Sequence, residues 1–186
     1  MRALESEYWK VIERFDAEAF RELMLTYGQE IWNYAFFLTK NPDYADDITQ
    51  EVFLKVYGQI GSFRGESSIR TWLLAITRNM TFNYRRSTFL RRVVLVGAVS
   101  RRDSHPSAEQ EALTNTLSNE LWEIIMNLPV KFREVLVLNA RYELSQREIA
   151  GLLGLSEGTV KSRLSRARQK VSVAWKEGTV YDRATT

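Results

Sequence analysis

Residues 144–168 have the sequence LSQREIAGLLGLSEGTVKSRLSRAR, which carries the clearest structural signal in the chain. Ser145 and Glu148 have the spacing of a capping box, in which each side chain bonds the backbone of the other residue at the start of a helix. Ser156 can cap a second helix. Between them, Gly154 can adopt the left-handed conformation that ends the first helix and turns the chain. This order predicts a helix-turn-helix.

The second helix of this motif is predicted to have one apolar and one basic face. Ala150 is small where the two helices approach each other, and Val160 can fill their interface. Three- and four-residue spacing predicts a buried stripe at Val160, Leu164, Ala167 and Val171. The other side carries groups that can contact base edges in a DNA major groove, or phosphates. The predicted DNA contacts are Thr159, Lys161, Ser162, Arg163, Ser165, Arg166 and Arg168. A merely solvated basic face is the alternative, but the two caps and Gly154 together favour DNA binding.

The composition narrows the class of protein. The chain has 186 residues, of which 45% are hydrophobic and 26% charged, the balance of a soluble folded protein. It has no cysteine, which excludes disulfides and thiolate catalysis, and its single histidine, His105, leaves little for a metal site. Asp46, Asp47 and Glu51 cluster without a His, Cys or glycine-rich phosphate loop beside them. We therefore expect no cofactor, no metal and no enzymatic activity.

No apolar run approaches the roughly 20 residues that a membrane helix needs. The first ten residues, MRALESEYWK, lack the pattern of a signal peptide. The sequence therefore predicts no membrane segment and a cytoplasmic location.

The formal net charge of +3 is the balance of oppositely charged blocks. Residues 1–58 carry 6 basic and 11 acidic side chains, whereas residues 59–102 carry 9 basic and 1 acidic. Residues 103–143 carry 3 basic and 7 acidic side chains, and residues 144–171 carry 6 basic and 2 acidic. The two basic blocks predict polyanion binding at two separate sites. The acidic block at 103–143 has no assigned partner and is interpreted as a solvated face.

Helical periodicity in the N-terminal half predicts three helices after a short leading one that contains Tyr8, Ile12 and Phe15. The first, which Asp16 could cap, has its apolar stripe at Phe20, Leu23, Tyr27, Ile31, Tyr34 and Leu38. The second opens at Asn41-Pro42, ends at Gly58, and buries Ala45, Ile48, Val52 and Val56. The third runs from about Ile69 to Arg86, with Ile69, Trp72, Leu73, Ile76 and Met80 inward.

Periodicity fails from about Ser87 and resumes near Ala108, so this basic stretch is interpreted as a linker. The next helix breaks at Asn127-Leu128-Pro129, and another, with Phe132, Val135, Leu136 and Leu138, precedes two short helices. The predicted fold is all-α, with two small helical domains joined by a flexible basic linker. The predicted boundaries are 1–87 for the first domain, 88–107 for the linker, 108–175 for the second domain and 176–186 for a tail.

Two N-terminal strings add a family resemblance. Residues 43–57 are DYADDITQEVFLKVY and residues 63–79 are FRGESSIRTWLLAITRN. Followed by the helix-turn-helix, in this order and spacing, they resemble bacterial RNA polymerase sigma factors. The similarity is to the compact extracytoplasmic-function group, which has only sigma regions 2 and 4. The resemblance covers most of the chain, and it implies promoter-specific transcription initiation.

A stripe along the second predicted helix consists of Asp47, Gln50, Glu51 and Leu54. Steps of three and four residues place these side chains on one exposed side. Taken alone, such a stripe is most simply a solvated face. The resemblance implies that it docks on the clamp helices of the polymerase β′ subunit, and that the second domain lies near the β flap.

The resemblance also implies that the third helix and the loop before it bind the −10 element as separated single strand, with a flipped base held by the loop. The residues implied are Phe63, Arg64, Ser67, Arg78, Asn79, Asn83, Arg85 and Arg86. The helix-turn-helix would bind the −35 element. Trp72 could stack on a base, but its inward spacing favours a place in the core.

One alternative is a conventional helix-turn-helix regulator with an N-terminal sensing domain. It predicts a dimer that binds DNA independently, and it leaves the stripe at Asp47 to Leu54 and the first basic block unexplained. For a sigma factor of this group, the resemblance also implies an anti-sigma factor as partner, often membrane-anchored.

Overall fold

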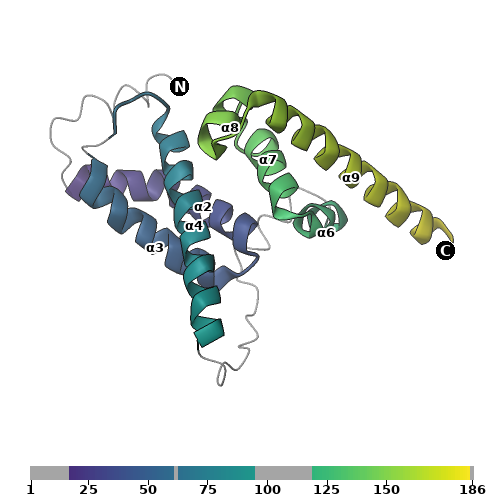
Figure 1. The fold of residues 1–186 in the computed structure, drawn as a ribbon, viewed down its shortest axis with the longest axis horizontal. Helices are drawn as coiled ribbons and strands as arrows, with labels where there is room; N and C mark the ends of the chain where they lie inside the picture. Colours follow the sequence, from purple (N-terminus) through teal and green to yellow (C-terminus); the bar gives the residue numbers. More distant parts are fainter. Residues whose placement is uncertain (1–16, 61–62, 95–118, 185–186) are drawn as a thin grey trace. The chain divides into compact units, whose positions relative to one another are not determined.

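The structure is a computed structural model. It describes the backbone of residues 17–60, 63–94 and 119–184, and their side chains except those of 85–94, 119 and 177–184. The described residues form α-helices and no strands (Figure 1). The chain divides into two compact units, Met1–Ser104 and His105–Thr186. The predicted all-α fold is confirmed.

The first unit contains α2 (Ala17–Thr39), α3 (Pro42–Gln59) and α4 (Ile69–Val94), each packed against the other two. The turn between α2 and α3 follows the predicted chemistry. Lys40 has a positive φ of 59°, and the Asn41 side chain accepts a hydrogen bond from the Tyr44 N–H at 2.9 Å. Pro42 occupies the first turn of α3, where its missing N–H costs nothing.

The predicted stripes of α2 and α3 are buried, except that Phe20 is half-buried and that α2 is buried on all sides from Ile31 to Leu38. Leu23, Ile31, Ile48 and Val52 are all buried. In α4 the prediction is only partly right, because Trp72 and Met80 are half-buried. Leu74, Thr77 and Thr81 are buried as well. The buried face of α4 is therefore wider than the predicted stripe. The Thr77 and Thr81 hydroxyls donate to the carbonyls of Leu73 and Thr77, both at 2.8 Å.

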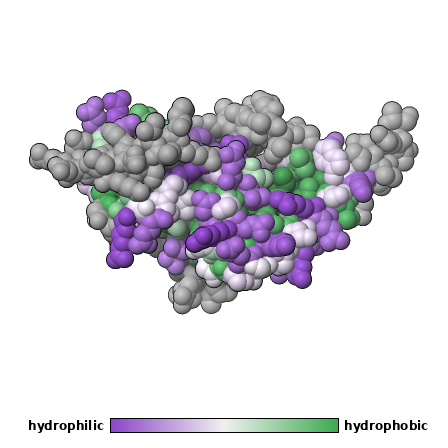
Figure 2. Space-filling view, turned by 90° about the horizontal axis from the view of Figure 1, so that it is seen from above, coloured by the Kyte–Doolittle hydropathy of each residue, from purple (hydrophilic) through white to green (hydrophobic). Residues whose placement is uncertain are grey.

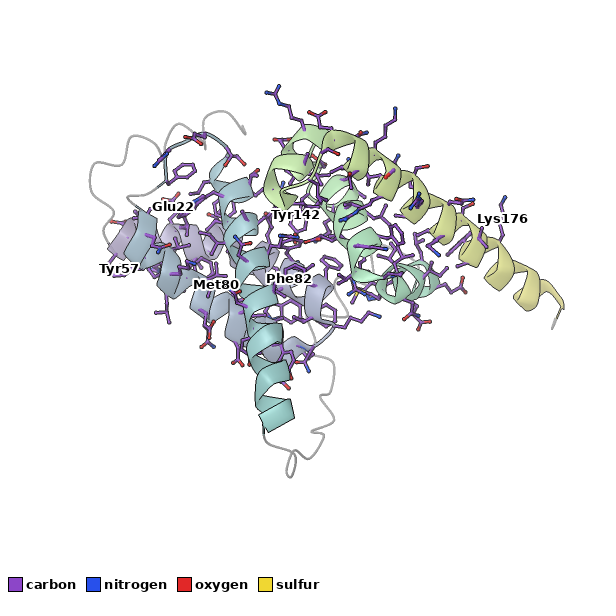
Figure 3. All side chains as sticks on the ribbon, in the orientation of Figure 1. Glu22, Tyr57, Met80, Phe82, Tyr142 and Lys176 are labelled. Carbon is purple, nitrogen blue, oxygen red and sulfur yellow. The ribbon has the colours of Figure 1, made fainter. Side chains whose placement is uncertain are left out.

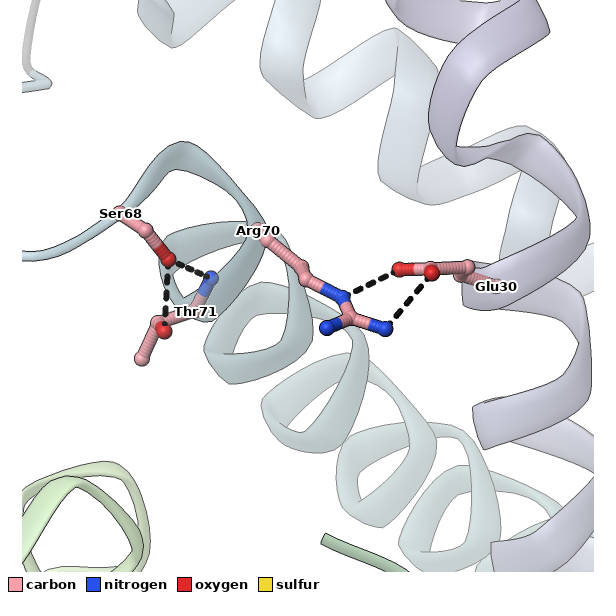
Figure 4. Close-up of polar contacts among 4 residues, drawn as sticks. All are labelled: Glu30, Ser68, Arg70 and Thr71. Atoms are coloured by element: carbon pink, nitrogen blue, oxygen red, sulfur yellow. Dashed lines mark hydrogen bonds and ion pairs between the residues drawn. The ribbon is translucent and has the colours of Figure 1, made fainter. Parts of the chain in front are cut away.

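The start of α4 is fixed by two sets of polar contacts (Figure 4). The Ser68 hydroxyl accepts a hydrogen bond from the Thr71 N–H at 3.1 Å, which caps the helix. Arg70 forms a bidentate pair with Glu30 of α2, with Nε 2.6 Å from Oε2 and Nη2 2.7 Å from Oε1. Such a forked pair fixes orientation as well as distance, so it ties the first turn of α4 to α2.

The second unit contains α6 (Asn119–Asn127), α7 (Val130–Ala140), α8 (Gln146–Leu153) and α9 (Glu157–Ala184). Helix α9 packs against the other three, and Leu128, Phe132 and Ala167 form a buried cluster. The break at Asn127-Leu128-Pro129 occurs as predicted. Buried Arg133 stabilises it by donating from Nη1 to the carbonyls of Met126, at 2.5 Å, and Leu128, at 3.3 Å.

Three predicted helix ends are wrong. Helix α3 continues through Gly58 to Gln59, because Gly58 keeps a helical conformation. Helix α4 continues beyond Arg86 to Val94, into the segment interpreted as linker. Helix α9 was predicted to be short and followed by a tail, but it is long and reaches Ala184. Neither extension contains proline, and an interior glycine weakens a helix without ending it. The leading helix, the Asp16 cap, His105 and the helix start near Ala108 lie outside the described residues.

None of the helices within these described ranges combines the length and apolar character needed to span a bilayer. Figure 2 shows hydrophilic side chains over much of the coloured part of one face, with hydrophobic areas between them.

Candidate functional site

The helix-turn-helix is built as its sequence predicts. The Ser145 hydroxyl accepts a hydrogen bond from the Glu148 N–H at 3.2 Å, and the Ser145 N–H donates to Glu148 Oε2 at 2.8 Å, which completes the capping box. Gly154 ends α8 in the left-handed conformation, with φ 66° and ψ 39°. Ser156 starts α9 by accepting a hydrogen bond from the Thr159 N–H at 3.2 Å.

The outer face of α9 carries the predicted polar and basic groups. Val160, Leu164 and Ala167 are buried, whereas Lys161, Ser162, Ser165 and Arg166 are exposed and Arg163 is half-buried. Two hydroxyls are already engaged. The Ser162 hydroxyl donates to the Thr159 carbonyl at 3.0 Å, and the Thr159 hydroxyl lies 2.9 Å from that of Ser156. Ser162 can therefore offer a ligand mainly acceptor lone pairs.

Arg168 is held by a residue that the sequence did not indicate. Arg168 Nη2 donates to Asn139 Oδ1 at 2.9 Å, and Asn139 Nδ2 donates to the Leu144 carbonyl at 3.0 Å. Asn139 thus joins α9 to the turn between α7 and α8. The remaining guanidinium donors of exposed Arg168 can still bind an anion. The available signal in the sequence is an amide at the end of α7, directly after the apolar run from Val135 to Leu138.

The predicted docking stripe lies together on the outer face of α3. Asp47, Gln50, Glu51 and Leu54 are all exposed, and Leu54 has 74% of its surface accessible. Tyr57, which is not among the predicted docking residues, lies one turn further along and is 60% exposed (Figure 3). The Phe20 ring of α2 supports it, with centroids 5.1 Å apart. The stripe is thus acidic at one end and apolar at the other.

Two neighbouring carboxylates of α3, Asp47 in the stripe and Asp46 beside it, receive hydrogen bonds from aromatic side chains of two other helices. Trp32 Nε1 of α2 donates to Asp46 Oδ1 at 2.6 Å, and the Tyr84 hydroxyl of α4 donates to Asp47 Oδ2 at 2.8 Å. The pKa of Tyr84 is raised to about 12, first by burial and then by the bond to Asp47. The raised pKa means that the Tyr84 hydroxyl keeps its proton, and remains a donor, at more alkaline pH than an ordinary tyrosine.

The predicted −10 residues gather along α4 and its preceding loop. Asn79 and Asn83 are exposed, four residues apart on one face, and half-buried Trp72 lies on the same face seven residues before Asn79. The Phe63 ring lies 5.3 Å from that of Trp72. The prediction that Trp72 belongs to the core is therefore only partly right, because its side chain is half-buried and its ring lies beside that of Phe63 in the loop.

The remaining −10 candidates differ in how they are held. The Arg78 guanidinium lies over the Phe82 ring at 4.8 Å, and Phe82 is labelled in Figure 3. Arg64 and Ser67 are exposed in the loop, and Gly65 between them has a positive φ of 68°. Arg85 and Arg86 lie in α4, but their side chains are outside the described part.

Comparison with known families assigns both units. The model of sigma-70 region 2 matches residues 23–89, and that of sigma-70 region 4 matches residues 118–171. The chain is 34% identical over 153 residues to the RNA polymerase sigma factor YlaC of Bacillus subtilis, covering 81% of this chain and 88% of the relative. The chain belongs to the sigma-70 family. Its similarity to the ECF RNA polymerase sigma factor SigW of Bacillus subtilis, at 29% identity over 86% of this chain and 90% of the relative, is in line with the extracytoplasmic-function group.

Solved structures agree with a sigma factor fold. The sigma factor RpoE of Bartonella quintana, solved with the anti-sigma factor NepR, has a TM-score of 0.71 at 24% identity, covering 86% of this chain and 98% of that one. CnrH, solved with the cytosolic domain of CnrY, has a TM-score of 0.63 at 25% identity, covering 95% and 97%. As an ECF sigma factor, the protein acts in promoter-directed transcription initiation with RNA polymerase.

Proposed function

We propose that this sigma factor divides promoter recognition between its two units: region 2 docks on core polymerase and binds the −10 element, and region 4 binds the −35 element. The observation that carries the proposal is the outer face of α9, where exposed Lys161 and Arg166 stand opposite buried Val160 and Leu164 on a helix-turn-helix. This is the arrangement that places donors in a major groove.

In region 4, the base-contacting groups are Lys161, Ser162, Ser165 and Arg166. Arg and Lys donate to the O6 and N7 acceptors of guanine, and Ser162 accepts more readily than it donates. Thr159, Arg163 and Arg168 lie beside them and bind phosphates, which position the helix without selecting sequence.

In region 2, Asn79 and Asn83 offer amides to unpaired bases, and Phe63 with Trp72 offers aromatic surface beside the loop. Stacking on aromatic rings suits separated strands, whose bases expose their faces. Arg64, Ser67, Arg78, Arg85 and Arg86 complete the surface as phosphate or sugar contacts.

The α3 stripe of Asp47, Gln50, Glu51 and Leu54, extended by Tyr57, docks on the clamp helices of the polymerase β′ subunit. Its acidic end suits a basic partner, and its apolar end supplies buried area once the partner covers it. Region 4 lies near the β flap. The factor has no catalytic role of its own, acts in the cytoplasm and is held inactive by an anti-sigma factor.

Two modest DNA contacts joined through polymerase bind more tightly than either alone, because the second contact becomes intramolecular. With a net charge of only +3, the free protein is expected to bind DNA weakly. A conventional regulator would instead bind DNA as an independent dimer, and it leaves the α3 stripe without a role.

The test is transcription in vitro with purified protein and core polymerase. A pool of duplexes randomised at the −35 and −10 segments is selected on the assembled holoenzyme, and the recovered fragment serves as template. Initiation from this fragment, dependent on the added protein, is the expected result. Failure to bind core and to initiate would overturn the proposal, and dimeric DNA binding without core would favour the regulator.

A further inference from the structure

The Tyr84 hydroxyl connects the docking stripe on α3 with the proposed −10 surface on α4. Tyr84 follows Asn83 directly on the proposed −10 helix, and its hydroxyl donates to Asp47 Oδ2 at 2.8 Å in the docking stripe. The Tyr84 ring also lies against that of Tyr44 in the first turn of α3, with centroids 5.1 Å apart. Ring and hydroxyl together fix α4 against the acidic end of α3.

We propose that Tyr84 is a positioning residue that couples polymerase docking to −10 recognition through its hydrogen bond to Asp47. The inference rests on the proposed function, since it needs α3 to meet polymerase and α4 to meet the −10 strand.

Asp47 can accept the hydrogen bond from Tyr84 and bind a basic group of the polymerase at the same time. A carboxylate has two oxygens and about four acceptor positions, and Tyr84 uses one of them on Oδ2. Asp47 is exposed, so Oδ1 remains open to a basic group of the partner. A carboxylate already fixed by one bond loses less rotamer freedom when it binds that group. Tyr84 thereby prepares the docking surface.

The same bond sets the position of the −10 residues. Along α4, Asn79 and Asn83 lie between Arg70, which is tied to Glu30 of α2, and Tyr84, which is tied to Asp47 of α3. The pair of Arg70 with Glu30 fixes the start of α4, and the hydrogen bond of Tyr84 to Asp47 fixes the turn of α4 that carries Asn83. When polymerase holds Asp47, it also holds this turn, and the amides meet the unpaired strand in one orientation.

The test uses the full chain in holoenzyme, assembled with saturating core. The probe is the fragment that wild-type holoenzyme selects from the randomised pool, and the reference is the same fragment with a scrambled −10 segment. Tyr84→Phe removes only the hydroxyl. Tyr44→Phe is the matched control, since it removes a neighbouring hydroxyl and keeps the ring that contacts Tyr84.

We expect Tyr84→Phe to lower the preference for the cognate over the scrambled fragment by about three- to tenfold, the range expected for one hydrogen bond. Tyr44→Phe should leave the preference unchanged. In an Asp47→Ala background, Tyr84→Phe should have no further effect, because the bond through which it acts is already gone.

An unchanged preference for Tyr84→Phe would overturn the coupling. So would a loss of the same size in the Asp47→Ala background, because Tyr84 would then act without Asp47. A general loss of region 2 stability would weaken binding to both fragments without changing their ratio, so that result also counts against it. If wild-type holoenzyme itself showed no −10 preference, the proposed function would fail and the coupling with it.

Discussion

Arg168 of α9 and Asn139 of α7 are joined by a hydrogen bond of 2.9 Å between Nη2 and Oδ1. Asn139 is itself anchored to the Leu144 carbonyl at 3.0 Å, so the guanidinium is held beside the turn that leads into the helix-turn-helix. A cation oriented in this way is suited to a phosphate, which positions the protein on DNA without reading sequence.

Arg168→Ala is therefore expected to weaken holoenzyme binding to cognate and altered −35 fragments by the same factor. The slope of log affinity against log salt should fall in magnitude by about 1, since one phosphate contact is lost. Lys131→Ala, which removes an exposed cation from the start of α7, is the control. A salt titration of fragment binding gives both the affinity and its salt slope. A loss of affinity confined to one −35 sequence would assign Arg168 to base recognition instead.

Arg166 is expected to behave in the opposite way, because its exposed side chain lies on the outer face of α9 where a guanidinium can reach a guanine. Arg166→Ala should cost about 1–3 kcal/mol of discrimination at one −35 base pair. The measurement is affinity for fragments changed singly at each −35 position. An unchanged preference at every position would remove Arg166 from base recognition.

Sequence predicted the parts of this fold that depend on local rules. The capping box at Ser145 and Glu148, the left-handed Gly154 and the Asn41 cap of α3 all involve residues within a few positions of one another, where chemistry fixes geometry directly. The exposed face of α3 was predictable from helical periodicity, which separates Asp47 and Leu54 from buried Ile48 and Val52.

The contacts that escaped prediction join positions far apart in the chain. Tyr84 and Asp47 are 37 residues apart, and Arg168 and Asn139 are 29 apart. Periodicity assigns a side chain to a face but does not say which helix meets that face. Trp72, predicted in the core, is only half-buried and its ring lies beside that of Phe63, because helical periodicity does not place the loop that precedes α4.

Gly154 offers a direct test of the turn. Its φ of 66° is strained for any side chain, although a Cβ there would meet no atom within 4 Å. Gly154→Ala should therefore destabilise the second unit by about 1–2 kcal/mol through backbone conformation alone. Gly151→Ala is the matched control, because it lies in α8 with equally open space and should stabilise by about 0.5–1 kcal/mol. Opposite shifts in urea unfolding are expected, and equal shifts would contradict the role of the turn.

Glu51→Lys tests the docking surface. Glu51 is exposed in the acidic part of the α3 stripe, so reversal of its charge should repel a basic partner and weaken core binding while helix content stays unchanged. Glu66→Lys makes the same change on a side chain that is 80% exposed in the loop before α4, and should bind core normally without DNA. Pull-down of core polymerase measures core binding, and circular dichroism measures helix content. Normal assembly of the Glu51 variant would exclude this part of α3 from the interface.

The burial of Tyr84 and its bond to Asp47 should also be visible together as a dependence of stability on pH. The pKa of Tyr84 is raised from 10.0 to about 12 in the folded protein, by burial first and by Asp47 second, with smaller effects from Tyr44 and Glu51. Because the folded-state pKa lies above the unfolded one, this stabilisation is complete below the unfolded pKa and is lost as pH rises through the folded value. Urea unfolding of wild type and Tyr84→Phe, followed by fluorescence from about pH 9 to about pH 12, should show the difference in free energy of unfolding narrowing as pH rises. A constant difference for Tyr84→Phe across this range would mean that the Tyr84 hydroxyl contributes no pH-dependent stability.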